Sequence, residues 1–121
     1  MSGRIFVTGI GIISAIGLNA GETLDSLKKG RSGVGPIVHL DTVFKGELPV
    51  AEVRLSNREM AEICGVAEAG LVTRTTLLGL IAAREAVRQA GLNPSEKPYQ
   101  TGIVSATTCG GMDKTEINFK H

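Results

Sequence analysis

The stretch RIFVTGIGIISAIG, residues 4–17, decides the fold of this 121-residue chain. Its β-branched and aromatic side chains follow one another without polar alternation. Such a run is typical of a strand covered on both faces, in a mostly parallel sheet. Gly9 and Gly11 interrupt the run and indicate a close approach of two backbones. The stretch therefore predicts a buried strand followed by a glycine-rich turn.

A short helix is expected directly after this turn. Asn19 is a suitable N-cap for a helix over about 20–29, and Gly30 is a suitable residue to follow its end. Leu24 and Leu27 are three residues apart and are expected to form its buried face.

Composition excludes several classes of function. The formal charge is +1, and the chain has three Phe, one Tyr and no Trp. A nucleic-acid surface needs clustered cations or stacking aromatic side chains, so none is expected. No apolar run is long enough to span a membrane, and the first residues lack the pattern of a signal peptide. The two cysteines lack metal-site spacing, which favours a reduced, cytoplasmic setting. One domain is expected.

The middle of the chain predicts a short strand and a capped helix. The region after the first helix is rich in Gly and Pro and is expected to be irregular. A short strand is expected at 50–53. Ser56 and Glu59 form a capping-box pattern, which predicts a helix over about 57–64 that ends at Gly65.

The strongest helix signal lies over about 72–90 and ends at Gly91. A second buried strand is expected at 101–108. After the Gly-Gly turn, residues 113–119 can begin another helix. The order of these elements indicates an α/β arrangement. Because the long helix is apolar nearly all round at its centre, we expect it to be buried in a larger body. Its apolar residues are Leu77, Leu78, Leu80, Ile81, Ala82, Ala83, Ala86, Val87 and Ala90.

The segment TGIGIISAIG also invites a dinucleotide-binding interpretation, which we reject. That fingerprint requires Gly at its third position, where this chain has Ser14. It also requires a carboxylate about 20 residues later to hold the ribose. Lys28, Lys29 and Arg31 occupy that region instead. Glycines that let a strand and a turn pack closely explain the pattern better.

Charged side chains elsewhere give little chemistry. Lys28, Lys29 and Arg31 form a small basic cluster, which is either a solvated helix end or a docking site for an acidic protein. Glu85 and Arg88 are spaced to form an i,i+3 ion pair on the polar side of the long helix.

Cys109 has the position of a nucleophile, because it follows a predicted strand and precedes Gly-Gly. An activated thiol also needs a base and an orienting group within hydrogen-bond reach. His39 and His121 are the chain's two histidines, and no triad can be assembled from them. The alternative is a small packing residue at the end of a strand. Cys64 is interpreted as plain packing near a helix end.

Three ordered segments resemble the start of a β-ketoacyl-[acyl-carrier-protein] synthase. They are VTGIG at 7–11, LGLIAAREAVRQAGL at 78–92 and TGIVSATTCGGMDKTE at 101–116. The resemblance implies a thiolase-like α/β fold, layered α-β-α with a mostly parallel sheet. Residues 1–121 would then be the N-terminal portion of that family's N-terminal domain, incomplete and without a second domain.

The same resemblance implies an acyltransferase. Family members elongate an acyl thioester by decarboxylative condensation with malonyl-carrier protein. The implied partners are acyl carrier protein, acyl and malonyl thioesters, and a second ketosynthase chain in a homodimer or heterodimer. No cofactor and no metal are implied. The alternative is a ketosynthase-like, non-catalytic partner subunit of the chain-length-factor type.

The resemblance also locates a site. The family's catalytic Cys and two His match no residue here, so no catalytic residue is expected in this chain. Cys109, Gly110 and Gly111 match the wall of the family's acyl pocket near the dimer interface, where Ile or a similar residue is commoner than Cys. They are the expected substrate-binding residues. The family's basic run before the long helix, used for carrier docking, is reduced to Arg74.

Overall fold

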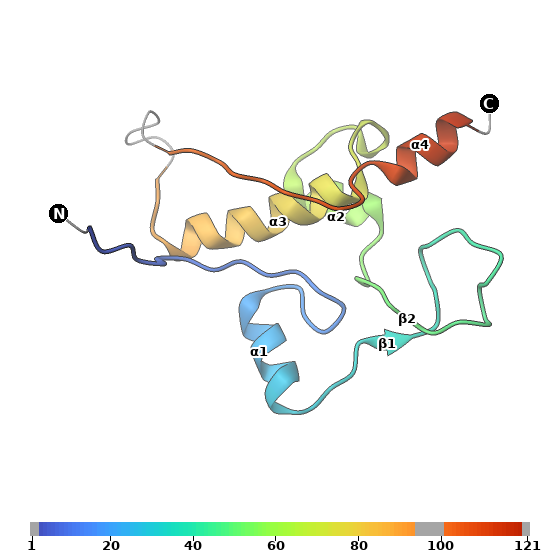
Figure 1. Cartoon of the computed structure of the whole chain (residues 1–121), viewed down its shortest axis with the longest axis horizontal. Helices are drawn as coiled ribbons and strands as arrows, with labels where there is room; N and C mark the ends of the chain where they lie inside the picture. Colours follow the sequence, from blue (N-terminus) through green and yellow to red (C-terminus); the bar gives the residue numbers. More distant parts are fainter. Residues whose placement is uncertain (1–2, 94–100, 120–121) are drawn as a thin grey trace.

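A computed structural model describes residues 3–93 and 101–119 of the chain. The long helix α3 lies at the centre, with extended chain and the shorter helices arranged around it (Figure 1). The elements, in chain order, are α1 (Ala20–Lys28), β1 (Val34–Gly35), β2 (Val50–Ala51), α2 (Asn57–Cys64), the 3₁₀ helix η1 (Ala69–Leu71), α3 (Arg74–Gln89) and α4 (Met112–Phe119).

The predicted helix boundaries are confirmed to within two residues, and their caps explain why. The Asn19 side chain accepts a hydrogen bond from the backbone N–H of Glu22. Ser56 and Glu59 complete the reciprocal capping box of α2. Such side chains satisfy the N–H groups that the first turn of a helix leaves unpaired. A glycine at positive φ follows each of α1, α2 and α3, namely Gly30, Gly65 and Gly91.

The core lies where α2 packs against α3. Met60, Ala61 and Leu77 are buried there, and both Met60 and Leu77 have 0% of their surface exposed. Leu80, in contrast, is 40% exposed. The expectation that α3 is buried all round is therefore wrong for this face of the helix. Neighbouring segments cover α3 only in part, whereas its sequence is apolar nearly all round.

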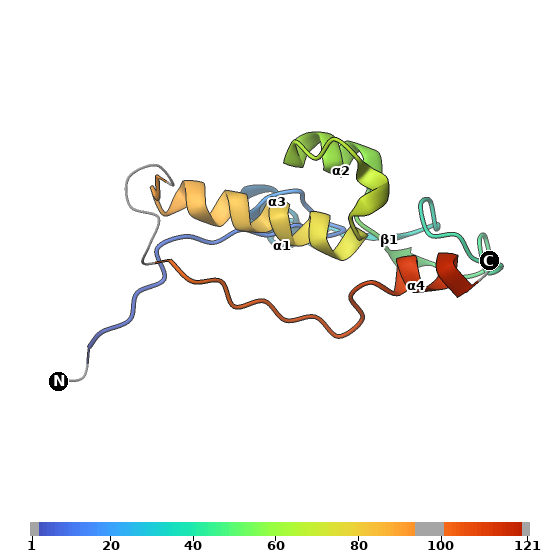
Figure 2. The same cartoon turned by 90° about the horizontal axis from the view of Figure 1, so that it is seen from above.

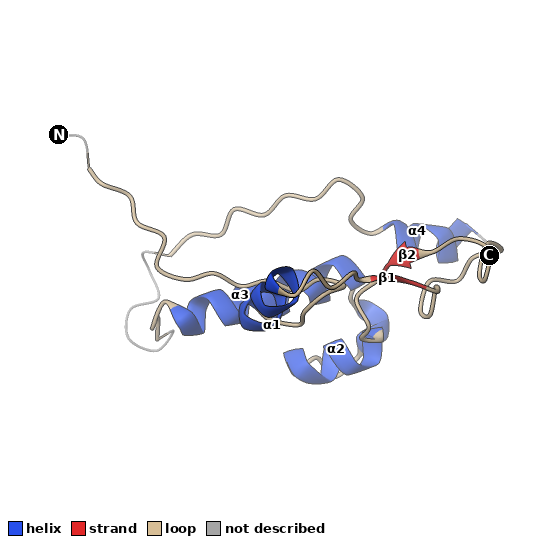
Figure 3. Ribbon diagram, turned by 90° about the horizontal axis from the view of Figure 1, so that it is seen from below, coloured by secondary structure: helices blue, strands red, loops and turns tan. Residues whose placement is uncertain are grey.

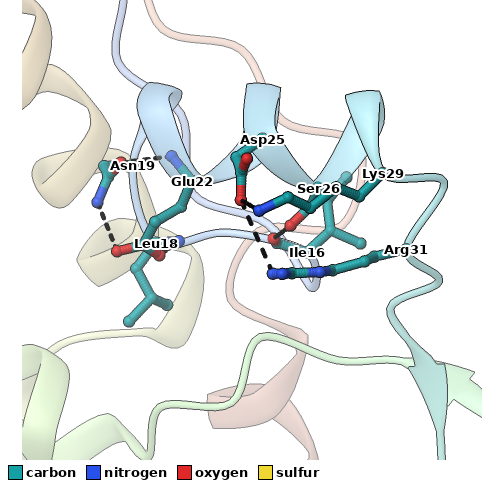
Figure 4. A network of polar contacts seen from close by, with 8 residues as sticks. All are labelled: Ile16, Leu18, Asn19, Glu22, Asp25, Ser26, Lys29 and Arg31. Atoms are coloured by element: carbon teal, nitrogen blue, oxygen red, sulfur yellow. Dashed lines mark hydrogen bonds and ion pairs between the residues drawn. The ribbon is translucent and has the colours of Figure 1, made fainter.

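Helix α1 does not bury the face that its leucines predict. Leu24 and Leu27 are both more than half exposed, and Thr23 and Ser26 are buried instead. The Ser26 hydroxyl donates to the carbonyl oxygen of Ile16 at 2.6 Å (Figure 4). The helix thus packs its small polar side onto the loop that precedes it, and the prediction of a leucine-lined face is wrong.

Within the described residues the only sheet is the antiparallel pair β1 and β2, which is shorter than the strand predicted at 50–53. Figure 3 draws the two buried strands predicted from the sequence as loop. We call them the N-terminal segment (residues 3–13) and the return segment (residues 101–107). Ile103 is 88% exposed, so the expected burial is also wrong. Because a strand has no hydrogen bonds of its own, neither segment can form a ladder without a neighbouring strand.

The two segments nevertheless have the direction that a parallel sheet requires. Both run along α3 in the direction opposite to the helix, and hence in the same direction as each other (Figures 1 and 2). This is the strand–helix–strand arrangement of an α/β fold. The described residues thus show part of an α/β arrangement without the mostly parallel sheet that was expected.

Candidate functional site

A groove of about 950 Å³ lies between α3 and the return segment. Its helix side presents short side chains and one leucine, and Gly110 and Gly111 also line it. The residues on this side are the N-cap Thr73 and the α3 residues Thr75, Thr76, Gly79, Leu80 and Ala83. Short, mostly uncharged side chains on both walls suit an apolar occupant better than a charged one.

The turn beside this groove requires its two glycines. A Cβ atom at Gly110 would lie 2.6 Å from the Thr107 side chain, and Gly111 has a φ of +87°. The Gly111 carbonyl oxygen accepts hydrogen bonds from the backbone N–H groups of Lys114 and Thr115, each at 3.1 Å. The turn thereby leads directly into α4. Lys114 Nζ donates to the Gly70 carbonyl oxygen at 2.6 Å and ties α4 to η1.

The structure separates the three expected substrate-binding residues. Gly110 and Gly111 line the groove, whereas Cys109 is exposed, is not disulfide-bonded and is absent from the lining. A role in substrate binding stays a prediction for all three.

The chain's other cysteine packs against the core, as the sequence indicated. Cys64 lies against the core residues, and its Sγ is 3.8 Å from the Leu77 carbonyl oxygen. Within residues 3–93 and 101–119, no hydrogen bond joins a cysteine to a histidine, and His121 lies outside these residues.

Two polar side chains of α3 hold the N-terminal segment, and sequence reasoning missed both. The Glu85 carboxylate accepts hydrogen bonds from the backbone N–H groups of Ile12 and Ala20, each at 2.9 Å. One turn further along, Gln89 Oε1 accepts from the N–H of Ile10 at 2.5 Å. Glu85 thus joins three elements: the N-terminal segment, the start of α1 and α3. Its spacing of four residues from Gln89, on one helix face, is the sequence signal for this role.

These contacts also change the acidity of Glu85. The hydrogen bond from Ala20, followed by that from Ile12, holds the pKa of this carboxyl below its usual value of 4.5, although desolvation acts in the opposite direction. The positive charge of Arg88 adds a smaller lowering effect. The expected Glu85–Arg88 ion pair is therefore replaced by backbone hydrogen bonds, with Arg88 acting through space.

Gly9 and Gly11 allow the close approach on which these bonds depend. A Cβ atom at Gly9 would overlap the carbonyl oxygen of Ala86, and one at Gly11 would overlap that of Ala82. Any side chain at either position would push the N-terminal segment away from α3. The packing interpretation of these glycines is confirmed.

Arg74, the basic residue that begins the long helix, has a structural role. The Arg74 guanidinium donates to the carbonyl oxygens of Val53 and Leu55, at 2.7 and 2.9 Å, and to Asn57 Oδ1 at 2.9 Å. These bonds fix the chain between β2 and α2 against the start of α3. A side chain held in this way is poorly placed to receive an acidic partner.

The basic cluster after α1 is partly neutralised from within the helix. Lys29 Nζ lies 2.7 Å from Asp25 Oδ2, and an Arg31 guanidinium nitrogen lies 4.0 Å from the same oxygen (Figure 4). Lys28 is exposed and takes part in neither contact. Both interpretations of the cluster, a solvated helix end and a docking site, are compatible with this arrangement.

Glu52 organises the long loop between β1 and β2, residues 36–49, which we call the β1–β2 excursion. Its carboxylate accepts three consecutive backbone N–H groups, from Val38, His39 and Leu40, at 2.7–3.0 Å. Desolvation alone would raise its pKa, but these bonds outweigh that effect and the pKa is lowered. Lys45 Nζ donates to the Val38 carbonyl oxygen at 3.0 Å and closes the excursion from the other side.

In the part of the chain that the structure describes, no three His, Cys, Asp or Glu side chains are grouped so that they could hold a metal ion. No helix there is long and apolar enough to cross a membrane.

Comparison with known proteins gives one consistent result. The sequence model of the family described as "Beta-ketoacyl synthase, N-terminal domain" matches residues 2–120. Nodulation protein E of Rhizobium sp. (strain N33) is 31% identical over 99% of this chain and 29% of its own length. The 3-oxoacyl-[acyl-carrier-protein] synthase 2 of Staphylococcus aureus (strain COL) is 31% identical over 97% of this chain and 28% of its own length. The chain thus spans less than a third of these relatives. No solved structure matches.

Proposed function

Because this chain belongs to the β-ketoacyl synthase family, through that family's N-terminal domain, we propose that it is part of an acyltransferase that elongates acyl chains. The reaction is the decarboxylative condensation of an acyl thioester with malonyl-carrier protein. The observation that supports it is the family match, which extends over residues 2–120.

We infer that the chain contributes pocket wall and scaffold to this reaction, without a catalytic residue of its own. Cys64 packs against the core, and among the described residues no histidine is bonded to Cys109. The turn of Cys109, Gly110 and Gly111 follows an uncharged segment, and its two glycines line the groove. We assign Gly110 and Gly111 to the wall of the acyl site on this geometry, and Cys109 on the family resemblance alone.

The proposed partners follow from the same reaction. An acyl carrier protein delivers the thioesters, and a second ketosynthase chain completes a cytoplasmic homodimer or heterodimer. Because Arg74 is held by three internal hydrogen bonds, the cluster of Lys28, Lys29 and Arg31 is the better candidate surface for an acidic carrier.

A condensation assay with acyl- and malonyl-carrier substrates tests the reaction. The protein expressed from the complete gene is expected to form the β-ketoacyl product, and the purified 121-residue chain is expected to form none. Turnover by the chain alone that is lost in Cys109→Ala would overturn the assignment of Cys109. If the complete protein binds carrier but condenses only after a second ketosynthase subunit is added, the non-catalytic partner function replaces the one proposed.

Substitution of Cys109 tests the pocket assignment. In the complete protein, Cys109→Phe is expected to lower kcat/KM for long acyl substrates by roughly tenfold to a hundredfold, because overfilling a packed site costs about 1–3 kcal/mol. Short substrates should lose much less, and Cys109→Ser serves as the volume-matched control. An equal loss at every chain length would contradict a role in size selection.

A further inference from the structure

A second groove, of about 920 Å³, runs along α3, and we call it the arginine groove. The loop before α1, the end of α2 and the residue that follows Gly91 complete its walls. It shares only Leu80 and Ala83 with the groove beside the return segment. Its volume is within the range of small-molecule sites. The apolar side chains that line it are Leu18, Ile63, Leu80, Ile81, Val87 and Leu92.

The arginine groove faces away from the N-terminal segment. The glycines of that segment lie against the carbonyl oxygens of Ala82 and Ala86. Arg84 and Arg88 line the groove, and each follows one of these alanines by two residues, which is about 200° of rotation around a helix. The groove therefore lies on a face of α3 that the N-terminal segment leaves open.

The charged side chains of this groove are Arg84, Glu85 and Arg88, which leaves an excess of one positive charge. The Glu85 carboxylate already accepts two backbone N–H groups. Within residues 3–93 and 101–119, the Arg84 guanidinium makes one hydrogen bond, to the Ile63 carbonyl oxygen at 2.7 Å, and the Arg88 side chain makes none. Because the two arginines are four residues apart on one helix, their charges repel each other. An anion bound between them would remove that repulsion.

We propose that the arginine groove binds a free alkyl-chain carboxylate, with the charged end between Arg84 and Arg88 and the chain on the apolar side chains beside them. Guanidinium groups bind carboxylates through charge-assisted hydrogen bonds. Leu80 and Arg88 are about 12 Å apart along the helix, which leaves room for an extended chain. No charged side chain lines the groove beside the return segment, so a carboxylate is expected to prefer the arginine groove. The proposed ligand is a bare anion and no thioester, and the proposal does not rest on the condensation reaction.

Isothermal titration calorimetry of the 121-residue chain with octanoate, below its micelle concentration, tests the site. Acetate has the same charged end without the chain, and 1-octanol has the same chain without the charge. Each is expected to bind at least about tenfold more weakly than octanoate, because each loses one of the two contributions. Absence of octanoate binding, or equal affinity for 1-octanol, would overturn the proposal.

Substitution of Arg88 locates the bound octanoate. Arg88→Gln should raise the Kd by about tenfold, because it removes a charged donor. The fold should persist, since this side chain holds no other element among the described residues. Arg4→Gln removes the same charge from an exposed residue outside the groove, and it should leave the Kd unchanged. An equal effect of the two substitutions would overturn the proposal.

A variant of the neighbouring groove guards against binding at the wrong place. Gly79 lines the groove beside the return segment and does not line the arginine groove, and a Cβ there meets nothing within 4 Å. Gly79→Leu should therefore fill the neighbouring groove and leave the octanoate Kd unchanged. If Gly79→Leu weakens binding while Arg88→Gln does not, octanoate occupies the neighbouring groove and the proposal is wrong.

Discussion

The core where α2 packs against α3, which we call the α2–α3 corner, and the return segment are both built from apolar sequence. The corner is packed, whereas the return segment is exposed. The corner buries Met60, Ala61 and Leu77, whereas the return segment leaves Ile103 and Val104 open to solvent. The difference lies in the backbone. A helix satisfies its hydrogen bonds within itself and needs only a packing partner for one face, whereas a strand needs another strand. The corner is therefore formed by its own residues, whereas the return segment has no neighbouring strand among the described residues.

The largest effect is expected at the centre of the corner. Leu77→Asp should destabilise the chain by roughly 4 kcal/mol or more, because it removes a fully buried side chain and introduces an unpaired charge. Leu80→Asp, three residues along the helix, should cost roughly 1 kcal/mol, since Leu80 is 40% exposed. Sequence periodicity alone assigns both leucines the same severe loss. Urea denaturation of the two variants separates these expectations, and equal losses would show that the open face of α3 is covered in solution.

A smaller effect is expected where the N-terminal segment meets α3. Gly11→Ala should cost about 1–3 kcal/mol, because the new methyl group overlaps the Ala82 carbonyl oxygen. Gly79→Ala is the control on the exposed face of the same helix, where a Cβ meets nothing within 4 Å. It should stabilise by about 0.5–1 kcal/mol through helix propensity. Thermal melting gives the sign of each change. A neutral Gly11→Ala would mean that the segment is not seated on α3.

The smallest effect is expected from Glu85 and depends on pH. Because its pKa is lowered in the folded chain, the ionised carboxylate stabilises the fold above its ordinary value of 4.5. This stabilisation is lost as the pH falls through the lowered folded pKa. The parent chain should therefore exceed Glu85→Gln in melting temperature at pH 7, and the difference should shrink below about pH 4.5. A difference that does not change with pH would exclude the carboxylate as its source.

Local features of this fold could be predicted, and distant ones could not. Asn19, the Ser56–Glu59 pair and Gly65 act within four residues of their own position, so their patterns were sufficient to set helix ends. Glu85 bonds to Ile12, 73 residues away, through a long side chain that no short pattern specifies.

Burial was the least predictable property. The leucines of α1 and Leu80 have the spacing of a covered face, but spacing does not say whether a covering element is present. For the candidate site, the glycines of the 108–111 turn could be located from the sequence. The exposure of Cys109 beside the groove could not, because it depends on how that turn is oriented.

The Glu52 carboxylate has a consequence for how this chain tolerates variation in length. By accepting three N–H groups at residues 38–40, it closes the base of the β1–β2 excursion, close to the strand pair. The tip, around Val43 and Gly46, is exposed and lies outside these bonds. Extra residues inserted at the tip would lengthen the loop while the base stays in register. The excursion is thus a place where a tag or a fluorescent label can be introduced with little disturbance to α1 and α3.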